Sequence, residues 1–337
     1  MKKSKNLFLL LPIFLLIFSN CRDNSVSSTE WSIPSSEVFD GGPGKDGIPS
    51  VDDPKFRAAS ETTYLGDNDL VLGIQIGNDI RAYSHPVLDW HEIVNDEIDG
   101  VPVAITYCPL TGTGIGWDRT IDGDVTEFGV SGLLYNSNLI PYDRKTDSNW
   151  SQMANECVNG ELLNTPIQTH LMVETSWKTW KEMFPNSQVL TTDTGKNRNY
   201  GTYPYGSYRT SGNLNFPISI SDNRLHIKER VLGVLVNGKA KAYQFEKFEG
   251  NDISVIEDTF EGKDLVIVGS EDKNFLVAFE RDFNGSLRTF TPLQNELPAV
   301  MQDEVGNKYD FFGKVLEGPD ANQVLSLIHI SEPTRPY

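Results

Sequence analysis

The stretch VLGIQIGNDIRAYSH occupies residues 71–85, and a degraded copy, VLGVLVNGKAKAYQF, occupies residues 231–245. The match resumes at residues 99–128, which align with residues 261–290. The two copies share alternating aliphatic residues and turn glycines, which are properties of a β scaffold. The sequence therefore predicts two diverged β repeats, at about 71–128 and 231–290, within one compact region.

Alternation and β-branched residues predict strands in both repeats. In the first they fall at residues 70–76, 79–84, 101–107, 113–118 and 126–131, and in the second at 231–236, 240–244, 253–256, 264–269, 275–280 and 287–291. Pro86 predicts the start of a helix at about 86–95, and a short helix is predicted between Thr175 and Pro185. Its Trp177 and Trp180 have the spacing of core residues. Without regular βαβ spacing, the pattern predicts a β-rich α+β fold.

The repeats differ in residues that can do chemistry. Ser270 stands where the first repeat has Cys108, and no residue of the second repeat corresponds to His91. Cys108 ends a strand just before Pro109 and a turn, where sulfur and backbone N–H groups can face one point. We predict Cys108 as a nucleophile or redox thiol and His91 as its base. Glu92, Asn95 or Asp143 would orient the imidazole.

Polar residues around this turn and after the first repeat are the predicted ligand contacts. Arg144 and Gln152 are predicted to hold a ligand, with Trp150 as an apolar wall. Asn95 lies four residues after His91 on the predicted helix, so both side chains would face one cleft. The remaining candidates are the turn residues Thr111 and Thr113. As an alternative, Asp143 and Arg144 form an ion pair that only fixes a loop.

Two other roles compete for Cys108. Cys157 is the second cysteine of the predicted exported part, and an even pair in an oxidising compartment most simply forms a disulfide. A metal site is the other alternative, because cysteine, histidine and aspartate are suitable zinc or copper ligands. His85 and His91 are six residues apart, however, and no tight ligand spacing is present, so no metal site is predicted. No cofactor can be assigned.

Both ends of the chain carry segments outside the predicted domain of residues 31–324. Residues 1–20 combine a basic start with an apolar run that is short for a membrane span, and Cys21 follows. This predicts a lipoprotein signal peptide, lipidation at Cys21 and a polar tether over residues 21–30. An ordinary signal peptide is the alternative. Residues 325–335, LSLIHISEPTR, match the in-frame translation of a transposase-type sequencing adapter, so we expect residues 325–337 to be an artefact.

The chain is strongly acidic, with a formal net charge of −18. Such a charge repels phosphate backbones, and nucleic acid is not expected as a partner. The expected partners are a membrane, through the N-terminal lipid, and a polar small molecule or envelope polymer. These features place the protein in the cell envelope, on the periplasmic or surface side.

Several sequence blocks follow one another in a fixed order: GPGKDGIP (42–49), HEIVND (91–96), TYCPLTGT (106–113), FGVSGLLYN (128–136) and YDRKTDSNWSQ (142–152). Together they resemble the DUF3179 family of exported bacterial proteins. Many members have Cys-Pro-Leu-Cys where this chain has Thr111 as the fourth residue, so a redox or metal pair is not available here. The resemblance implies an exported protein but no reaction. The sequence therefore leaves two hypotheses: an envelope enzyme that uses Cys108 and His91, or a non-catalytic binding lipoprotein.

Overall fold

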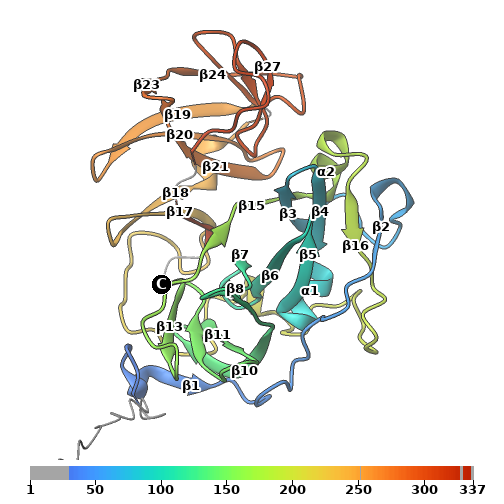
Figure 1. The fold of residues 1–337 in the computed structure, drawn as a ribbon, viewed down its shortest axis with the longest axis vertical. Helices are drawn as coiled ribbons and strands as arrows, with labels where there is room; N and C mark the ends of the chain where they lie inside the picture. The colour runs from blue at the N-terminus through green and yellow to red at the C-terminus, as the bar shows by residue number, and fades with distance from the viewer. Residues whose placement is uncertain (1–29, 251, 327–328, 335–337) are drawn as a thin grey trace, which may run out of the picture.

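The computed structural model describes residues 30–250, 252–326 and 329–334. The predicted signal peptide, Cys21 and nearly all of the predicted tether lie outside these residues. Within them the chain is β-rich, with two short α-helices, and Figure 1 shows the strands gathered into several small sheets. The predicted β-rich α+β class is confirmed. Across the described ranges, no helix has the length and apolarity needed to cross a membrane.

The N-terminal part forms three larger sheets, in the lower and right-hand parts of Figure 1. The strand order of the first sheet is β1 (Val38–Asp40), β10 (Phe128–Tyr135), β11 (Asn138–Asp143), β12 (Asn149–Ser151) and β13 (Glu156–Asn159). The order of the second is β14 (Thr169–His170), β7 (Thr113–Asp118), β6 (Val101–Cys108) and β5 (Ile93–Ile98). The order of the third is β15 (Met172–Ser176), β3 (Leu70–Ile76), β4 (Asp79–Ser84), β16 (Gln188–Leu190) and β2 (Phe56–Ala58). The short pair β8 (Thr120–Ile121) and β9 (Asp124–Val125) follows β7.

The C-terminal part forms the upper sheets of Figure 1. One three-stranded sheet has the order β18 (Lys239–Gln244), β17 (Val231–Val236), β28 (His329–Thr334), and another has the order β19 (Ser254–Phe260), β20 (Lys263–Ser270), β21 (Phe275–Glu280). Strands β22 (Asp282–Phe283) and β23 (Ser286–Leu287) form a pair. A four-stranded sheet has the order β24 (Phe290–Pro292), β25 (Met301–Asp303), β26 (Lys308–Tyr309), β27 (Val315–Glu317). Single 3-10 turns are η1 (Ser35–Glu37), η2 (Ala59–Glu61), η3 (Tyr208–Thr210) and η4 (Phe245–Phe248). The expectation that residues 325–337 are an artefact stays a prediction.

The helix predicted at residues 86–95 is wrong in its second half. Helix α1 covers His85–His91, with Pro86 in its first turn, and it ends at Glu92, where φ is 58°. Residues Ile93–Ile98 then form β5, antiparallel to β6, because their β-branched side chains are buried between layers. The helical face that would have placed His91 beside Asn95 therefore does not form.

The two regions predicted to be repeats have the same strand pairing. Val71 pairs with Ser84 in the β3–β4 hairpin, and Val231 pairs with Gln244 in the β17–β18 hairpin. Cys108 pairs with Thr113 where β6 meets β7, and Ser270 pairs with Phe275 where β20 meets β21. These pairs fall at the aligned positions of the two sequences. That one duplicated unit gave rise to both regions stays a prediction.

The same pairing continues past the predicted ends of the repeats. The Cys157 N–H donates to the Thr165 carbonyl at 2.9 Å, and the Val315 N–H donates to the Gln323 carbonyl at 2.8 Å. Bridges between Glu156 and Pro166 and between Lys314 and Val324 close the two loops alike. The correspondence therefore extends over about residues 71–167, which we call the first region, and about residues 231–325, which we call the second region.

Helix α2 (Trp177–Met183) packs into a core shared by both regions. The Ser176 Oγ caps it by accepting the Thr179 N–H at 3.3 Å. The predicted burial of Trp177 and Trp180 is confirmed, and the Trp180 ring stacks on Phe311 with centroids 6.2 Å apart. Gly73 allows this packing, since a Cβ at residue 73 would lie 1.9 Å from the Trp180 ring.

Candidate functional site

Cys108 lies at the end of β6, where Pro109 interrupts the strand. Its side chain is 1% exposed, and its thiol donates to the Ser137 carbonyl at 3.6 Å. The turn that follows places the Leu110 and Thr111 N–H groups and the Thr111 hydroxyl against the sulfur, which lowers its pKa. Burial has the larger effect, so the net pKa of the thiol is raised. The resting group is a thiol, with donors in place for negative charge that develops on sulfur.

Glu92 is the ionisable group that the structure brings to Cys108. Its carboxyl is 6% exposed, and burial, with a smaller effect of nearby Asp89, raises its pKa to about 7. The Tyr205 hydroxyl donates to Glu92 Oε1 at 2.8 Å. The charge of Glu92 in turn raises the pKa of Cys108. A carboxyl with a pKa near neutrality can both accept and return a proton at physiological pH.

The backbone at Glu92 is unusual for a residue with a side chain. Its φ is 58°, a value that glycine adopts easily and other residues adopt at a cost of about 1–3 kcal/mol. The conformation ends α1 and turns the chain into β5, while the Glu92 carbonyl accepts the Tyr107 N–H at 2.7 Å. A backbone strained next to a buried carboxyl is typical of functional positions.

Cys108 and Glu92 line one small cavity of about 50 Å³. Its other walls are apolar side chains and backbone, with Tyr205 as the second polar side chain; they are Gly41, Pro43, Ile48, Leu110, Val130, Gly132, Leu134, Tyr205 and Phe216. No lysine or arginine is among the described residues that line it. The cavity therefore suits a small uncharged group rather than an anion.

The segment at residues 200–216 covers this side of the first region. Tyr203 donates to the Pro109 carbonyl at 3.1 Å, and the Thr202 carbonyl accepts the Trp90 Nε1–H at 3.0 Å. Tyr205 and Phe216 close the cavity from the same segment. The aromatic residues of this segment thus contact the site that the first region builds.

His91 contacts the covering segment rather than Cys108. Its Nδ1 lies 2.7 Å from the Pro49 carbonyl and its Nε2 lies 2.7 Å from the Tyr200 hydroxyl. Both ring nitrogens are therefore engaged by other groups. Burial lowers the pKa of His91, which favours the neutral ring. The structure thus gives the predicted base a positioning role and leaves the carboxyl of Glu92 facing the thiol's cavity.

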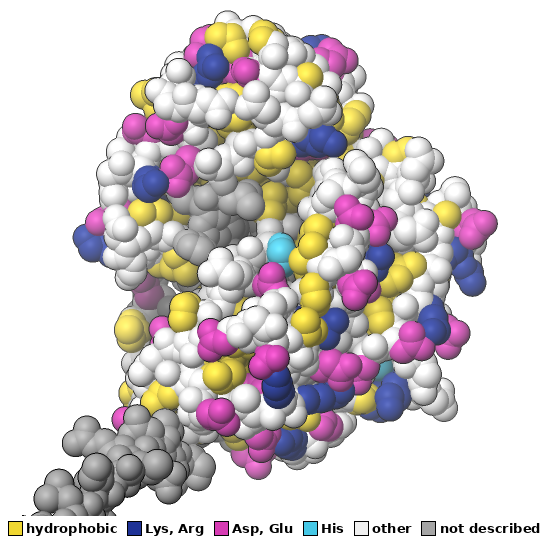
Figure 2. All heavy atoms as spheres, in the orientation of Figure 1, with side chains coloured by type: hydrophobic (Ala, Val, Ile, Leu, Met, Phe, Trp, Pro, Cys, Tyr) yellow, Lys and Arg dark blue, Asp and Glu magenta, His cyan; other side chains and the backbone are white. Residues whose placement is uncertain are grey.

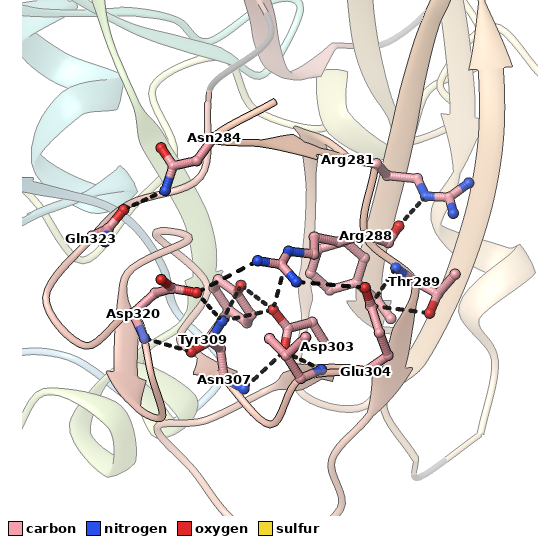
Figure 3. A network of polar contacts seen from close by, with 12 residues as sticks. Arg281, Asn284, Arg288, Thr289, Asp303, Glu304, Asn307, Tyr309, Asp320 and Gln323 are labelled. Carbon is pink, nitrogen blue, oxygen red and sulfur yellow. Dashed lines mark hydrogen bonds and ion pairs between the residues drawn. The ribbon is translucent and has the colours of Figure 1, made fainter. Parts of the chain in front are cut away.

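Asp143 holds a turn and is fully buried. Its carboxylate accepts the Thr146 N–H at 2.7 Å and the Trp150 Nε1–H at 3.1 Å. In the second region Asp303 holds the corresponding turn, since it accepts the Asn307 N–H at 2.8 Å and the Tyr309 hydroxyl at 2.7 Å (Figure 3). A role common to both regions is a scaffold role, because only the first region has the cysteine.

Gln152 belongs to a buried polar network. It accepts from Asn138 at 2.7 Å and donates to the Thr106 hydroxyl at 3.0 Å and the Thr113 carbonyl at 3.2 Å. Asn138 also donates to the Thr111 hydroxyl at 3.1 Å. The side chains of Gln152 and Thr111 are thus bonded inside the protein, where they fix the turn that carries Cys108. The Thr113 hydroxyl is buried and has no hydrogen-bond partner among the described residues.

Asn95 and Trp150 are also built into the fold. The Asn95 amide exchanges hydrogen bonds with the backbone of Phe128, at 2.8 and 2.9 Å, and reaches Asp52. The Trp150 ring is fully buried against Phe128 and Trp117. Both side chains join sheets of the first region.

Arg144 is one-third exposed and is already paired. Its Nη1 lies 2.8 Å from Asp52 Oδ2 and 2.8 Å from Glu127 Oε2, and its Nη2 donates to the Ser50 hydroxyl. These partners raise its pKa further although burial opposes them. The arginine therefore ties loops together, although with Asp52 and Glu127 rather than with Asp143.

The two described cysteines are both free thiols in the structure. Cys157 is buried, donates to the Asn159 carbonyl at 3.4 Å, and has a pKa raised to about 12, mainly by burial. Val315 occupies its place in the second region. Cys157 therefore behaves as a core residue and provides a natural comparison for Cys108. In the described ranges no group of three or more His, Cys, Asp or Glu side chains is placed to hold a metal ion.

The sequence did not single out a second buried set of ionisable residues. Asp89 lies 2.6 Å from Arg209 Nη2, which also donates to the Tyr107 hydroxyl at 3.2 Å. The Tyr107 hydroxyl lies 3.1 Å from His85 Nδ1, and His85 Nε2 lies 3.1 Å from Glu174 Oε2. Every member thus has an internal partner, and the chain of contacts fastens the covering segment to the first region.

Comparison with known protein families gives a match over most of the chain. The family described as "Protein of unknown function (DUF3179)" matches residues 45–332. The chain belongs to the DUF3179 family. No curated protein and no solved structure matches it. The DUF3179 match spans both the Cys108–Glu92 cavity and the second region, so the paired arrangement of the two regions lies within the family's own extent.

Proposed function

We propose that this DUF3179 protein is a thiol enzyme of the cell envelope that transfers a small acyl group through Cys108. One observation carries the proposal: a thiol and a carboxyl whose pKa is about 7 share an apolar cavity of about 50 Å³. Raised carboxyl pKa values beside a nucleophile are typical of general acid–base pairs. The small uncharged cavity limits the acyl group to a few carbon atoms.

The proposed reaction follows from the positions of the two groups. Cys108 Sγ attacks the carbonyl carbon of an ester or thioester while Glu92 accepts the thiol proton. The bond from the carbonyl carbon to the leaving oxygen or sulfur breaks, and Glu92 returns the proton to that atom. Water then hydrolyses the resulting thioester and regenerates the thiol. The Leu110 and Thr111 N–H groups stabilise negative charge on sulfur during attack and release.

Acylation with p-nitrophenyl acetate tests this proposal. We expect release of nitrophenol with formation of acetylated Cys108, identified by peptide mass spectrometry, and no acetylation of Cys157. Cys108→Ser abolishes the adduct, while Cys157→Ser leaves it unchanged. Glu92→Gln slows acylation by about 10²-fold, the usual contribution of a positioned base. Equal reactivity of Cys108 and Cys157, or an unchanged rate in Glu92→Gln, would rule the proposal out.

The proposed location rests on residues 1–21 of the sequence. A basic start, an apolar run and Cys21 support export and lipid attachment, which would hold the enzyme at an envelope membrane. Expression with Cys21→Ser is expected to move the protein from the membrane fraction to the soluble envelope fraction. Retention of the variant on the membrane would refute lipid anchoring through this residue.

A further inference from the structure

A second cavity lies where the first and second regions meet, and its volume is about 530 Å³. Its walls come from the β3–β4 turn and β14 on one side and from the loops around β27 on the other. Figure 2 shows this face of the molecule hollowed between its upper and lower parts. The volume is within the usual range for small-molecule sites, about 300–1,000 Å³.

The charge of this cleft differs from that of the whole chain. The lining residues are Gln75, Gly77, Asn78, Thr169, His170, Leu171, Phe312, Lys314, Asn322 and Val324. No aspartate or glutamate is among these described lining residues, although the chain's net charge is −18. Lys314 makes no ion pair with any described residue, in contrast to most lysines of the second region. The charge of Lys314 acts on the buried carboxyl of Asp310 without forming an ion pair with it. An ammonium that lacks an ion pair with described residues favours a ligand that carries a carboxylate.

The rest of the lining suits a ligand with hydroxyl groups. The side-chain amides of Asn78 and Asn322 form no hydrogen bond with described residues, so their donors and acceptors are available to a ligand. Leu171 and Phe312 form an apolar wall, and Val324 is 53% exposed beside it. A polar rim around an apolar wall is the usual lining of a site for a ring with one polar and one apolar side.

We infer that this cleft binds a sugar acid of the hexuronate class. The ligand carboxylate pairs with Lys314, its hydroxyl groups bond to Asn78 and Asn322, and the apolar side of its ring lies on Leu171 and Phe312. Glu156 occupies the first region's position equivalent to Lys314, as the matching bridges show. The carboxylate-binding charge is therefore specific to the second region, and the cleft is separate from the cavity at Cys108.

Calorimetric titration of the whole protein with D-glucuronate and D-glucose tests the inference. We expect saturable binding of D-glucuronate and at least 10-fold weaker binding of the uncharged D-glucose. Lys314→Gln is expected to weaken glucuronate binding about 10-fold and to leave glucose binding unchanged, because a charge-assisted hydrogen bond contributes more than a neutral one. Lys247→Gln, at an exposed lysine elsewhere on the second region, is the matched control and should change neither.

Other outcomes would overturn the inference. They are an absence of saturable glucuronate binding, equal affinity for glucose, or unchanged glucuronate affinity in Lys314→Gln. Should Lys314→Gln fail to fold, Asn78→Ala in the exposed β3–β4 turn replaces it, with a several-fold loss of affinity for both sugars expected. Unchanged affinity in Asn78→Ala would then count against the site.

Discussion

The first and second regions have the same strand pairing but different residues at the end of one strand. β6 ends in Cys108, next to Glu92, whereas β20 ends in Ser270, whose hydroxyl accepts the Lys273 N–H at 3.3 Å. Helix α1 and the strained Glu92 precede β5, whereas the single turn η4 stands at that place before β19. The comparison indicates that the sheets are a common support and that the proposed chemistry depends on a few residues at their ends.

Moving the thiol between the regions is expected to give the largest effect. Cys108→Ser removes acylation by p-nitrophenyl acetate, a loss of at least about 10³-fold for a missing nucleophile. Adding Ser270→Cys to that variant places a buried thiol at the equivalent position without a Glu92 neighbour. We expect no acylation of the new cysteine, measured by peptide mass spectrometry. Recovery of acylation at residue 270 would show that the strand end alone suffices.

The pH dependence of acylation separates the carboxyl from the thiol. Glu92 acts as a base only when ionised, so the rate should rise as pH increases through its pKa of about 7. In Glu92→Gln that inflection should disappear, with a rate about 10²-fold lower above pH 7. Stopped-flow rates between pH 5 and 9 provide the measurement, and Glu97→Gln, at the exposed position of β5, is the control. An inflection that persists in Glu92→Gln would assign it to another group.

Burial of Glu92 also predicts a stability change with a definite sign. Its folded-state pKa of about 7 lies above the ordinary value of 4.5, so the folded state binds the proton more tightly. The free energy of unfolding should therefore fall as pH rises from about 4.5 to 7, by roughly 3 kcal/mol from this group alone. Glu92→Gln should remove this fall and be more stable than the parent at pH 8.

Asp310 offers the matching test in the second region. Burial raises its pKa from 3.8 to about 6. Its contribution to the free energy of unfolding should therefore also fall with rising pH, but the fall should be complete near pH 6, below the pH at which the fall due to Glu92 ends. Denaturant unfolding of Glu92→Gln, Asp310→Asn and the parent at pH 5 and pH 8 separates the contribution of Glu92 from that of Asp310. Identical pH dependence of the parent and Glu92→Gln would contradict the raised pKa of Glu92.

The smallest effects are expected at the shared aspartates. Asp143→Asn and Asp303→Asn each weaken charge-assisted hydrogen bonds in equivalent turns and should lower the free energy of unfolding by about 1–2 kcal/mol. Asp143→Asn should keep the acylation rate within about twofold, because Asp143 does not line the Cys108 cavity. Urea titration and the p-nitrophenyl acetate assay test this. A large loss of rate without a loss of stability would restore Asp143 as a catalytic residue.

Much of the strand pattern could be predicted because alternation depends on local sequence. The bounds of β3, β4, β7, β17 and β21 agree with the predicted ranges. The correspondence past residue 128 is not visible in the sequence because the side chains have diverged while the turn conformations are the same. Asn155 and Gly313, for example, both have positive φ at equivalent positions. Residue identity alone conceals such a correspondence.

The site was predicted only in part, and for physical reasons. Cys108 could be found because it is where the regions differ. The sequence predicts Glu92 only as a partner of His91, because the predicted helix runs through residue 95 and the turn at residue 92 leaves no local pattern. Tyr205 comes from a segment about 100 residues later without periodicity. Its contact with Glu92 depends on tertiary packing, which local patterns do not encode.

The most direct test of the account is the rate at which iodoacetamide alkylates Cys108 and Cys157 in the folded, non-reduced protein from pH 5 to 9. Intact mass and peptide mapping give the two rates separately. The account predicts that both thiols are free, that Cys108 reacts faster, and that its rate rises near pH 7 in the parent but not in Glu92→Gln. A disulfide between Cys108 and Cys157, or a Cys108 as slow as Cys157 at every pH, would contradict it.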